Sequence, residues 1–243
     1  MTSAPKSKLV SINHFNCRDQ LFKSLAVDCE TRLKNTLLKN DKASFIVPGG
    51  TTPAPVFLEL SKSDLEWKKI TIAQSDERWL GSDHPQSNQR LTENTFLINN
   101  AAQAGYVAMK NSSVTANKAL DQCNQDYHIL SPFTITMLGM GLDGHIASLF
   151  PNSNHIKEGL SNDNKNLCID IDATGCPVAG EYTERMSLTL NGILASEQII
   201  LLITGNEKLK LVEDWLDKQA DMSCPVSFLL NQTKTPLTIY WAE

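Results

Sequence analysis

The sequence predicts an α/β fold in which a single doubly wound, mainly parallel β-sheet is flanked by helices. Short apolar segments rich in β-branched residues alternate along the chain with longer amphipathic segments, and this alternation is typical of βα units. No internal repeat, low-complexity tract or Pro/Gly-rich linker interrupts the 243 residues. Because one α/β domain accommodates a chain of this length, we expect a single domain covering residues 1–243.

The first predicted element is an amphipathic helix. Leucine or cysteine recurs at four-residue spacing from Leu21 to Leu37, with Lys and Glu between these positions, and the pattern ends at the polar residues 39–41. Pro53 suits the first turn of a later helix, a position that tolerates its missing N–H. The elements expected next are a strand at 44–47, a helix from Pro53 through Leu60, a strand at 70–73 and a helix at 88–97.

The second half of the chain continues the alternation. The segment FTITML at 133–138 is rich in residues with high strand propensity. The Asn- and Ser-rich residues 151–166 are expected to form a surface loop. The other elements expected here are helices at 117–130, 186–194 and 207–216, and strands at 167–171, 198–203 and 237–240.

Composition excludes several classes of protein. The chain has 22 Lys and Arg against 27 Asp and Glu, a net charge of −5, so we expect no nucleic-acid partner, because such a surface is basic. With 41% hydrophobic residues the chain is too apolar to be disordered. The longest apolar run, residues 199–203, is too short to span a bilayer, so we expect no membrane partner.

The six cysteines indicate a reducing compartment. No two of them form a C-x-x-C pair, so neither a zinc ribbon nor a dithiol redox site is indicated. Residues 1–8 are polar and are followed by no apolar run, so we expect no signal peptide. We therefore expect free thiols and a cytoplasmic location. Nothing in the sequence requires an interface, and we expect a monomer.

Two segments that follow predicted strands carry residues suited to an anionic ligand. In the turn PGGTTP at 48–53, Gly49 and Gly50 allow close backbone approach, and a helix N-terminus follows, which favours phosphate. A plain strand-to-helix turn would have a similar composition. The segment SDERW at 75–79 follows the second strand and contains Arg78, a residue type suited to carboxylate and phosphate. In α/β sheets, ligands bind beyond the carboxyl ends of the strands.

The third such segment is the glycine-rich sequence GMGLDGHIASLFP at 139–151. It contains a formal G-x-G-x-x-G, but Pro151 stops any helix soon after His145, so we expect no dinucleotide cofactor. A helix N-terminus at His145 would hold its ring neutral, the state that a general base needs. Asp143 could orient this ring or line the pocket independently. The other four histidines are interpreted as structural.

Together these segments closely resemble the 6-phosphogluconolactonases, within the group that includes the glucosamine-6-phosphate deaminases. The motifs that carry the resemblance are VPGGTTP at 47–53, SDERWL at 75–80 with HPQSNQRL at 84–91, and LGMGLDGHIASLFP at 138–151. TERMSLT at 183–189 and TGNEK at 204–208 agree with it. The resemblance implies a Rossmann-like fold of the NagB/RpiA type, a phosphorylated sugar lactone as substrate, and no cofactor.

The implied reaction is hydrolysis of 6-phospho-D-glucono-1,5-lactone to 6-phospho-D-gluconate, the second step of the oxidative pentose phosphate pathway. We expect His145 and Asp143 to be catalytic, with His145 as general base. We expect no metal, since a lactone is already a reactive ester and no His/carboxylate metal spacing is present. The residues expected to bind substrate are Gly49, Gly50, Thr51, Asp76, Arg78, Asn88, Gly141, Gly144, Arg185 and Lys208.

Two alternatives compete with this interpretation. A glucosamine-6-phosphate deaminase/isomerase-type enzyme carries a Glu five residues after the His, as that branch of the resemblance implies, whereas this sequence has Phe150 there. A non-catalytic sugar-phosphate sensor would normally carry a DNA-binding helical module, and only one clear helix precedes the first predicted strand. Such a sensor would also have no need of His145.

Overall fold

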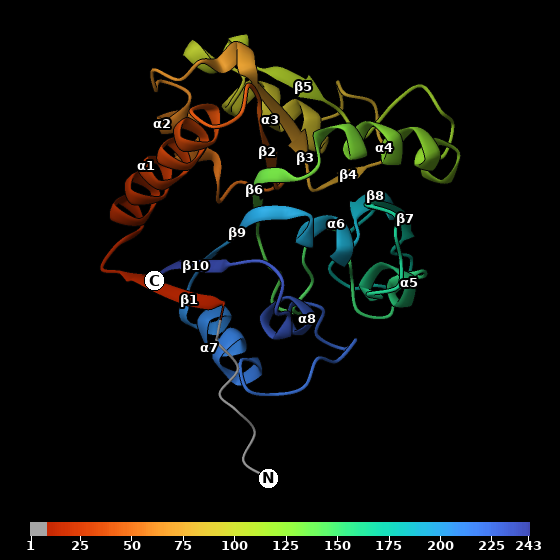
Figure 1. The fold of residues 1–243 in the computed structure, drawn as a ribbon. Helices are drawn as coiled ribbons and strands as arrows, with labels where there is room; N and C mark the ends of the chain where they lie inside the picture. The colour runs from red at the N-terminus through yellow and green to blue at the C-terminus, as the bar shows by residue number, and fades with distance from the viewer. Residues whose placement is uncertain (1–8) are drawn as a thin grey trace.

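The central sheet of the computed structural model has seven parallel strands, in the order β1-β10-β9-β6-β2-β3-β5 (Figure 1). The structure describes residues 9–243, so the interpretation of residues 1–8 as free of a signal peptide lies outside it. The predicted α/β fold class with a doubly wound parallel sheet is confirmed. The strands are β1 (Val10–Phe15), β2 (Ala43–Val47), β3 (Ile70–Gln74), β5 (Gly105–Val107), β6 (Phe133–Leu138), β9 (Ser196–Thr204) and β10 (Leu237–Ala242).

Both faces of this sheet are buried under helices. In β9, Ile200 and Leu202 belong to one hydrophobic cluster and Ile199, Leu201 and Ile203 to another, because successive side chains of a strand point to opposite faces. Helices α1 and α2 lie on one side of the sheet, and α7 and α8 on the other (Figure 1). The helices are α1 (Arg18–Leu37), α2 (Ala54–Leu60), α3 (Asn88–Thr95), α4 (Ala116–Leu130), α5 (Ile156–Leu160), α6 (Leu190–Leu194), α7 (Asn206–Trp215) and α8 (Val226–Asn231), with short 3-10 helices at Trp67–Lys69 and Asn99–Gln103.

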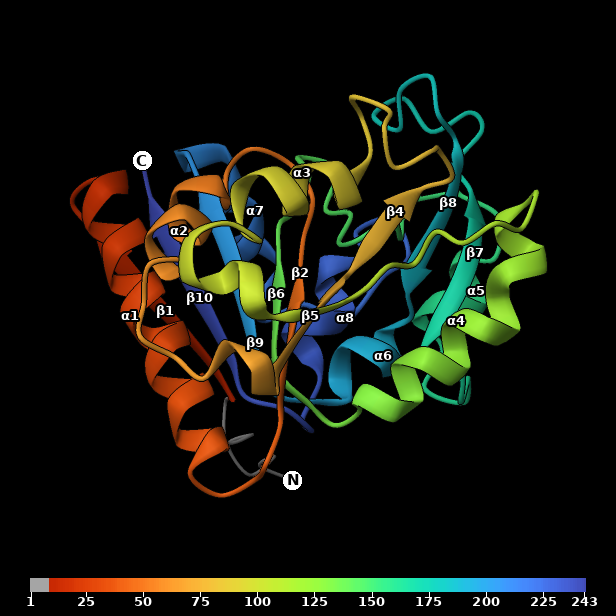
Figure 2. The same cartoon turned by 90° about the horizontal axis from the view of Figure 1, so that it is seen from above.

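A second, antiparallel sheet was not predicted. It consists of β4 (Asp76–Arg78), β8 (Glu184–Leu188) and β7 (Cys168–Asp172), and Figure 2 shows it beside the main sheet, with α4 packed against β7 and β8. The strand predicted at 167–171 therefore exists as β7 but lies in this smaller sheet. The strands β1, β4 and β5 and the helix α8 also went unpredicted.

Two predicted elements were wrong in part. Residues 186–188 form the end of β8 rather than the start of a helix, because Met186 pairs with β7 and helix α6 begins only after Thr189. The Thr189 Oγ1 accepts a hydrogen bond from the N–H of Gly192 at 2.9 Å, which marks the true helix start. The predicted loop at 151–166 contains the short helix α5, whose Ile156 and Leu160 are buried.

All six cysteines are unpaired, which confirms the expectation of free thiols. None of the helices found between residues 9 and 243 has both the length and the apolar character needed to cross a membrane.

The strand order creates a crevice between β2 and β6. From β2 the chain proceeds outward to β3 and β5, whereas β6 is followed outward by β9 and β10, so the winding direction changes between β2 and β6. These two strands pair only at Phe45–Ile135 and Ile46–Thr136, before their carboxyl ends. Ligands of doubly wound sheets bind at such a switch point. The glycine-rich segments after β2 and β6 lie at this point.

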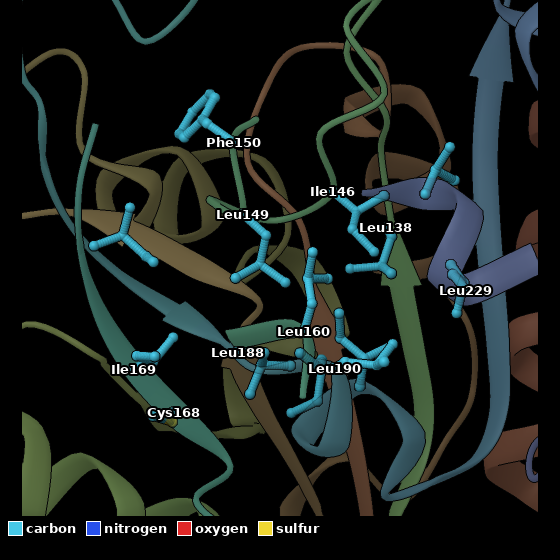
Figure 3. Close-up of a cluster of buried hydrophobic side chains, with 14 of the residues drawn as sticks. Leu138, Ile146, Leu149, Phe150, Leu160, Cys168, Ile169, Leu188, Leu190 and Leu229 are labelled. Atoms are coloured by element: carbon cyan, nitrogen blue, oxygen red, sulfur yellow. The ribbon is translucent and has the colours of Figure 1, made fainter. Parts of the chain in front are cut away.

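The segment after β6 is attached to the core by its own apolar side chains. Ile146 and Leu149 are fully buried and form a bridge with each other, and Figure 3 shows them among Leu138, Leu160 and Leu188. Leu149 also packs on α5, where a Cβ at Gly159 would lie 2.8 Å from its Cδ2. This burial holds residues 139–150 in one conformation above the sheet.

Leu149→Ala tests this attachment. Removing a fully buried leucine side chain from a packed core should lower the free energy of unfolding by about 2–5 kcal/mol, as measured by urea denaturation. Leu142 lies in the same segment but is 58% exposed, so Leu142→Ala should change the free energy of unfolding by no more than about 0.5 kcal/mol. Equal effects of the two substitutions would show that Leu149 does not anchor the segment.

Candidate active site

A cavity of about 240 Å³ opens at the switch point between β2 and β6. Nine of the predicted site residues line it: Gly49, Gly50, Asp76, Arg78, Asn88, Gly141, His145, Arg185 and Lys208. The other three do not line it. Thr51 is exposed and its neighbour Thr52 lines the cavity instead, whereas Asp143 and Gly144 belong to the turn that supports His145. The cavity therefore joins segments that lie far apart in the chain, from Pro48 to Lys208.

The Asp143–His145 pair forms a hydrogen-bonded dyad at the edge of this cavity. Asp143 Oδ1 lies 2.6 Å from His145 Nδ1 and also accepts from the His145 backbone N–H at 3.3 Å. An ionised Asp143 can only accept, so in the neutral form of the ring the proton lies on Nδ1 and Nε2 has a free lone pair. Among residues 9–243 Nε2 has no hydrogen-bond partner. Of the two roles left open for Asp143, the geometry favours orienting the ring.

The charge state of Asp143 is consistent with this role. Burial raises the pKa of Asp143, but its hydrogen bonds to His145 and the charge of that ring outweigh burial, so the pKa lies below its ordinary value. The expectation that a helix N-terminus keeps His145 neutral was wrong, because residues 146–149 form a turn with an Ile146–Leu149 bridge and no helix. The carboxylate of Asp143 therefore determines the tautomer without help from a helix dipole.

Two glycines make the dyad geometrically possible. A Cβ at Gly141 would lie 2.2 Å from His145 Nδ1 and 2.4 Å from Asp143 Oδ1, so only glycine leaves room for the dyad. Gly144 has φ +79° and a Cβ there would lie 2.4 Å from Cys224 Sγ. The backbone N–H of Gly141 donates to the carbonyl of His145 at 3.0 Å, and that of Gly144 donates to the carbonyl of Gly141 at 3.1 Å. These two hydrogen bonds close the turn that carries the imidazole ring of His145.

Three cationic side chains face the same cavity: Arg78, Arg185 and Lys208. Arg185 is only 4% exposed, and it donates from Nε to the carbonyl of Tyr182 at 2.8 Å and from Nη2 to that of Ala179 at 2.6 Å. None of the three forms an ion pair with a carboxylate in the described part of the chain. Cations that face a cavity without a carboxylate partner are suited to an anionic ligand.

Burial affects the acidity of these cations. It lowers the pKa of Arg185 to about 10, with Asp76 opposing the shift and Arg78 adding to it. Burial also lowers the pKa of Lys208. An anion that enters beside a buried cation is attracted to it strongly, because charge–charge attraction increases as the effective dielectric constant falls.

Asp76 and Glu77 have separate structural positions because adjacent residues of a strand point to opposite faces. Asp76 lines the cavity, and its carboxylate accepts from Ser148 Oγ at 2.7 Å and from Ser75 Oγ at 3.0 Å. Glu77 is fully buried on the other side, and burial raises its pKa although its hydrogen bonds oppose the shift. Its carboxylate accepts five hydrogen bonds, from the N–H groups of Arg78, Asn88 and Gln89 and from the side chains of Gln74 and Ser87. Glu77 thereby holds the N-terminus of α3 in place.

Asn88 connects this region to the turn after β2. Its Nδ2 donates to the backbone carbonyl of Asp76 at 2.9 Å, and a Cβ at Gly49 would overlap its side-chain amide. Gly50 has φ +82°, a conformation that side chains other than glycine rarely adopt. The predicted helix start was correct to within one residue, with Pro53 as the N-cap of α2.

Sequence reasoning did not single out several residues at the cavity, among them Thr52, Phe150, Val178 and Leu202. It also did not single out Ser148, which is fully buried and donates a hydrogen bond to Asp76. Ser148 and Phe150 lie within the glycine-rich segment 139–151, so their closeness to His145 along the chain could have identified them. Val178, in contrast, belongs to the connection between β7 and β8 and carries no motif. Between residues 9 and 243, no group of three or more His, Cys, Asp or Glu side chains is arranged to hold a metal ion.

Comparison with known proteins places this chain in a family. Residues 16–241 match the family model described as glucosamine-6-phosphate isomerases/6-phosphogluconolactonase. The chain belongs to this family. A 6-phosphogluconolactonase of Xylella fastidiosa is 32% identical over 218 residues, which cover 90% of each chain. One from Caulobacter vibrioides is 29% identical over 236 residues, covering 96% of this chain and 98% of the relative.

Solved structures agree with the family assignment. A 6-phosphogluconolactonase from Shewanella baltica superposes with a TM-score of 0.90 at 31% identity, covering 96% of this chain and 98% of the other. A monomeric glucosamine-6-phosphate deaminase superposes with a TM-score of 0.75 at 20% identity, covering 94% of this chain and 96% of the other. The second likeness shows a shared fold and no more.

The lowered pKa of Asp143 predicts a specific dependence of stability on pH. The pKa of Asp143 is lower in the folded protein than in the unfolded chain, so between these two pKa values the unfolded chain binds more protons. The contribution of Asp143 to the free energy of unfolding is therefore lost as the pH falls through the folded pKa. Asp143→Asn should therefore flatten the loss of unfolding free energy that occurs as the pH falls from about 5 to about 2, measured by urea denaturation.

His145→Gln provides the matched test, since it removes the partner instead of the carboxylate. It should reduce the loss of unfolding free energy over the same acid range. Adding Asp143→Asn to it should have little further effect if the two groups act as a pair. Parallel pH profiles for the wild-type protein and Asp143→Asn would contradict the assignment.

Proposed function

We propose that this protein is a 6-phosphogluconolactonase, which hydrolyses 6-phospho-D-glucono-1,5-lactone to 6-phospho-D-gluconate in the oxidative pentose phosphate pathway. The observation that carries the proposal is a general-base dyad in one cavity with three cations that have no carboxylate partner. The relatives named 6-phosphogluconolactonase support it. We further propose a single-domain, cytoplasmic monomer without cofactor, metal or nucleic-acid partner.

The dyad supplies the base for water attack. His145 Nε2 accepts a proton from a water molecule while the water oxygen bonds to the lactone C1, and the negative charge moves to the carbonyl oxygen. The nearby Asp143 carboxylate stabilises the imidazolium that forms. When the tetrahedral intermediate collapses, the C1–ring oxygen bond breaks and the imidazolium returns its proton to that oxygen. Water is thereby added across the ester bond.

The oxyanion of the intermediate needs a hydrogen-bond donor that is already in position. The N–H groups of Gly141 and Gly144 already donate within the glycine-rich turn. Arg78 uses one guanidinium N–H for the carbonyl of Gln86, at 2.5 Å, and keeps others. We therefore assign the oxyanion to Arg78, in preference to the amides of that turn.

The phosphate is assigned to a second group of donors. Arg185 and Lys208 provide positive charge, Lys208 lies in the first turn of α7, and Gly49 and Gly50 allow close backbone approach. Thr52 replaces Thr51 in this assignment, because Thr52 and not Thr51 lines the cavity. Binding energy from the phosphate would orient the lactone at the dyad.

A deaminase/isomerase-type reaction moves a proton between two sugar carbons and needs a second acid next to the histidine. In this chain the ring of Phe150 occupies that side of His145, with centroids 4.4 Å apart. A sugar-phosphate sensor would have no use for the oriented dyad. The coupled assay with lactone freshly produced by a glucose-6-phosphate dehydrogenase, corrected for spontaneous hydrolysis, tests the proposal. Absence of any acceleration, or ammonia release from glucosamine 6-phosphate, would refute it.

His145→Ala should lower kcat roughly 10²–10⁴-fold and leave the affinity for 6-phosphogluconate within about three-fold, because the ring acts on the attacking water. The measurement is the same coupled assay together with calorimetric product binding. His155, which lies outside the cavity, provides the control, and His155→Ala should leave kcat unchanged. A kcat for His145→Ala close to the wild-type value would exclude His145 as the base.

Arg185→Ala should raise KM for the phosphorylated lactone about 10- to 100-fold, because a charge-assisted hydrogen bond to phosphate is lost. Lys208→Ala should act in the same direction, whereas Lys210→Ala, at an exposed position of the same helix, should have no effect. KM for unphosphorylated glucono-1,5-lactone should change little in any of them. An equal rise with both lactones would rule out the phosphate assignment.

A further inference from the structure

Phe150 contacts two polar groups to which the proposed function gives different tasks, the base His145 and the phosphate ligand Arg185. It lies at the cavity and is only 3% exposed, and Figure 3 shows its ring set apart from the aliphatic side chains around Leu160 and Leu188. Its ring centroid is 4.4 Å from that of His145, at an interplanar angle of 39°. The guanidinium carbon of Arg185 lies 5.6 Å from the same centroid. The ring is thus shared by the proposed base and a proposed phosphate ligand.

The position of the ring is itself determined by the core. The preceding Leu149 is fully buried, and the Ser148 hydroxyl is hydrogen-bonded to Asp76. The carbonyl of Phe150 accepts from the N–H of Ser153 at 3.2 Å and from its Oγ at 2.9 Å. Backbone on both sides of Phe150 is therefore held, and the ring is a fixed reference for the groups that contact it.

The Arg185 guanidinium is constrained in two independent directions. Two of its N–H groups donate in the guanidinium plane to the carbonyls of Ala179 and Tyr182, while its position over the Phe150 ring fits a cation–π contact. His145 is held in the same way, by Asp143 at Nδ1 and by Phe150 at the ring. Arg185 and His145 are thus each held both by hydrogen bonding and by an aromatic contact, and the same Phe150 ring makes the aromatic contact with both.

We propose that Phe150 is a positioning residue that sets the separation between His145 and Arg185 and so selects a lactone with a phosphate at its far end. The inference rests on the proposed function. A substrate held at the phosphate reaches the base correctly only if this separation is constant, and a displacement of about 1 Å can cost on the order of 10²-fold in rate. Phe150 thereby converts phosphate binding into alignment of C1 with the attacking water.

The test compares two substitutions with two substrates. Phe150→Leu removes the aromatic face and keeps an apolar side chain, whereas Phe150→Tyr keeps the ring. The ratio of kcat/KM for the phosphorylated lactone to that for glucono-1,5-lactone should fall about 10-fold in Phe150→Leu and stay within about three-fold of wild type in Phe150→Tyr. The kcat for glucono-1,5-lactone should fall about three- to ten-fold in Phe150→Leu, through loss of the contact with His145.

A core phenylalanine outside the cavity separates positioning from general stability. Phe96 is fully buried and stacks on Phe57 with centroids 4.8 Å apart. Phe96→Leu should lower Tm and leave the substrate ratio unchanged. A wild-type ratio in Phe150→Leu, or the same loss in Phe150→Tyr as in Phe150→Leu, would overturn the proposal.

Binding of inorganic phosphate keeps this test independent of catalysis. Calorimetry should show that Phe150→Leu weakens phosphate binding about 10-fold, because Arg185 loses its aromatic contact. If the wild-type enzyme hydrolysed no lactone, the proposed function would fail while this measurement still tested the contact. Equal phosphate affinity of wild type and Phe150→Leu would overturn the inference even if the lactonase activity were confirmed.

Discussion

Burial of Ile146 and Leu149 in the core determines the position of the Asp143–His145 dyad and of Phe150. These two side chains bring the segment after β6 onto the sheet, and the dyad, Ser148 and Phe150 all lie between or beside them. A free loop of this glycine content would sample many conformations. Hydrophobic burial restricts it to one, so the polar site is ordered by an apolar contact that never touches the ligand.

The second constraint is electrostatic. The chain as a whole carries a charge of −5, yet the cavity contains two arginines and a lysine that form no ion pair within residues 9–243. Arg185 is kept in place by backbone carbonyls, which satisfy its N–H groups without cancelling its charge. The local arrangement of charge, and not the net charge of the protein, determines that an anion is favoured here.

Local sequence patterns correctly predicted the elements that are long enough to show a clear periodicity or that have a distinctive apolar composition. The helix from Arg18 and the strands at the sheet centre follow from spacing and apolar character alone. The helix prediction for residues 186–194 was wrong in part, because over so short a stretch their apolar residues fit both a helical and an alternating pattern. Pairing of Met186 with β7 decided in favour of a strand at the start of this stretch. The edge strands β1 and β5 were not predicted, because β1 mixes polar and apolar residues and β5 has only three residues.

The sequence by itself determined the chemistry: glycine-rich turns after strands, one histidine near an aspartate, and cations in recognisable segments. These are local properties, readable from a few neighbouring residues. Only the tertiary structure decided that Asp143 is hydrogen-bonded to His145, that Asp76 and Glu77 face different environments, and that Phe150 contacts both His145 and Arg185. Contacts such as Ser148–Asp76 and Phe150–Arg185 join residues far apart in the chain, and strand order and side-chain packing bring them together.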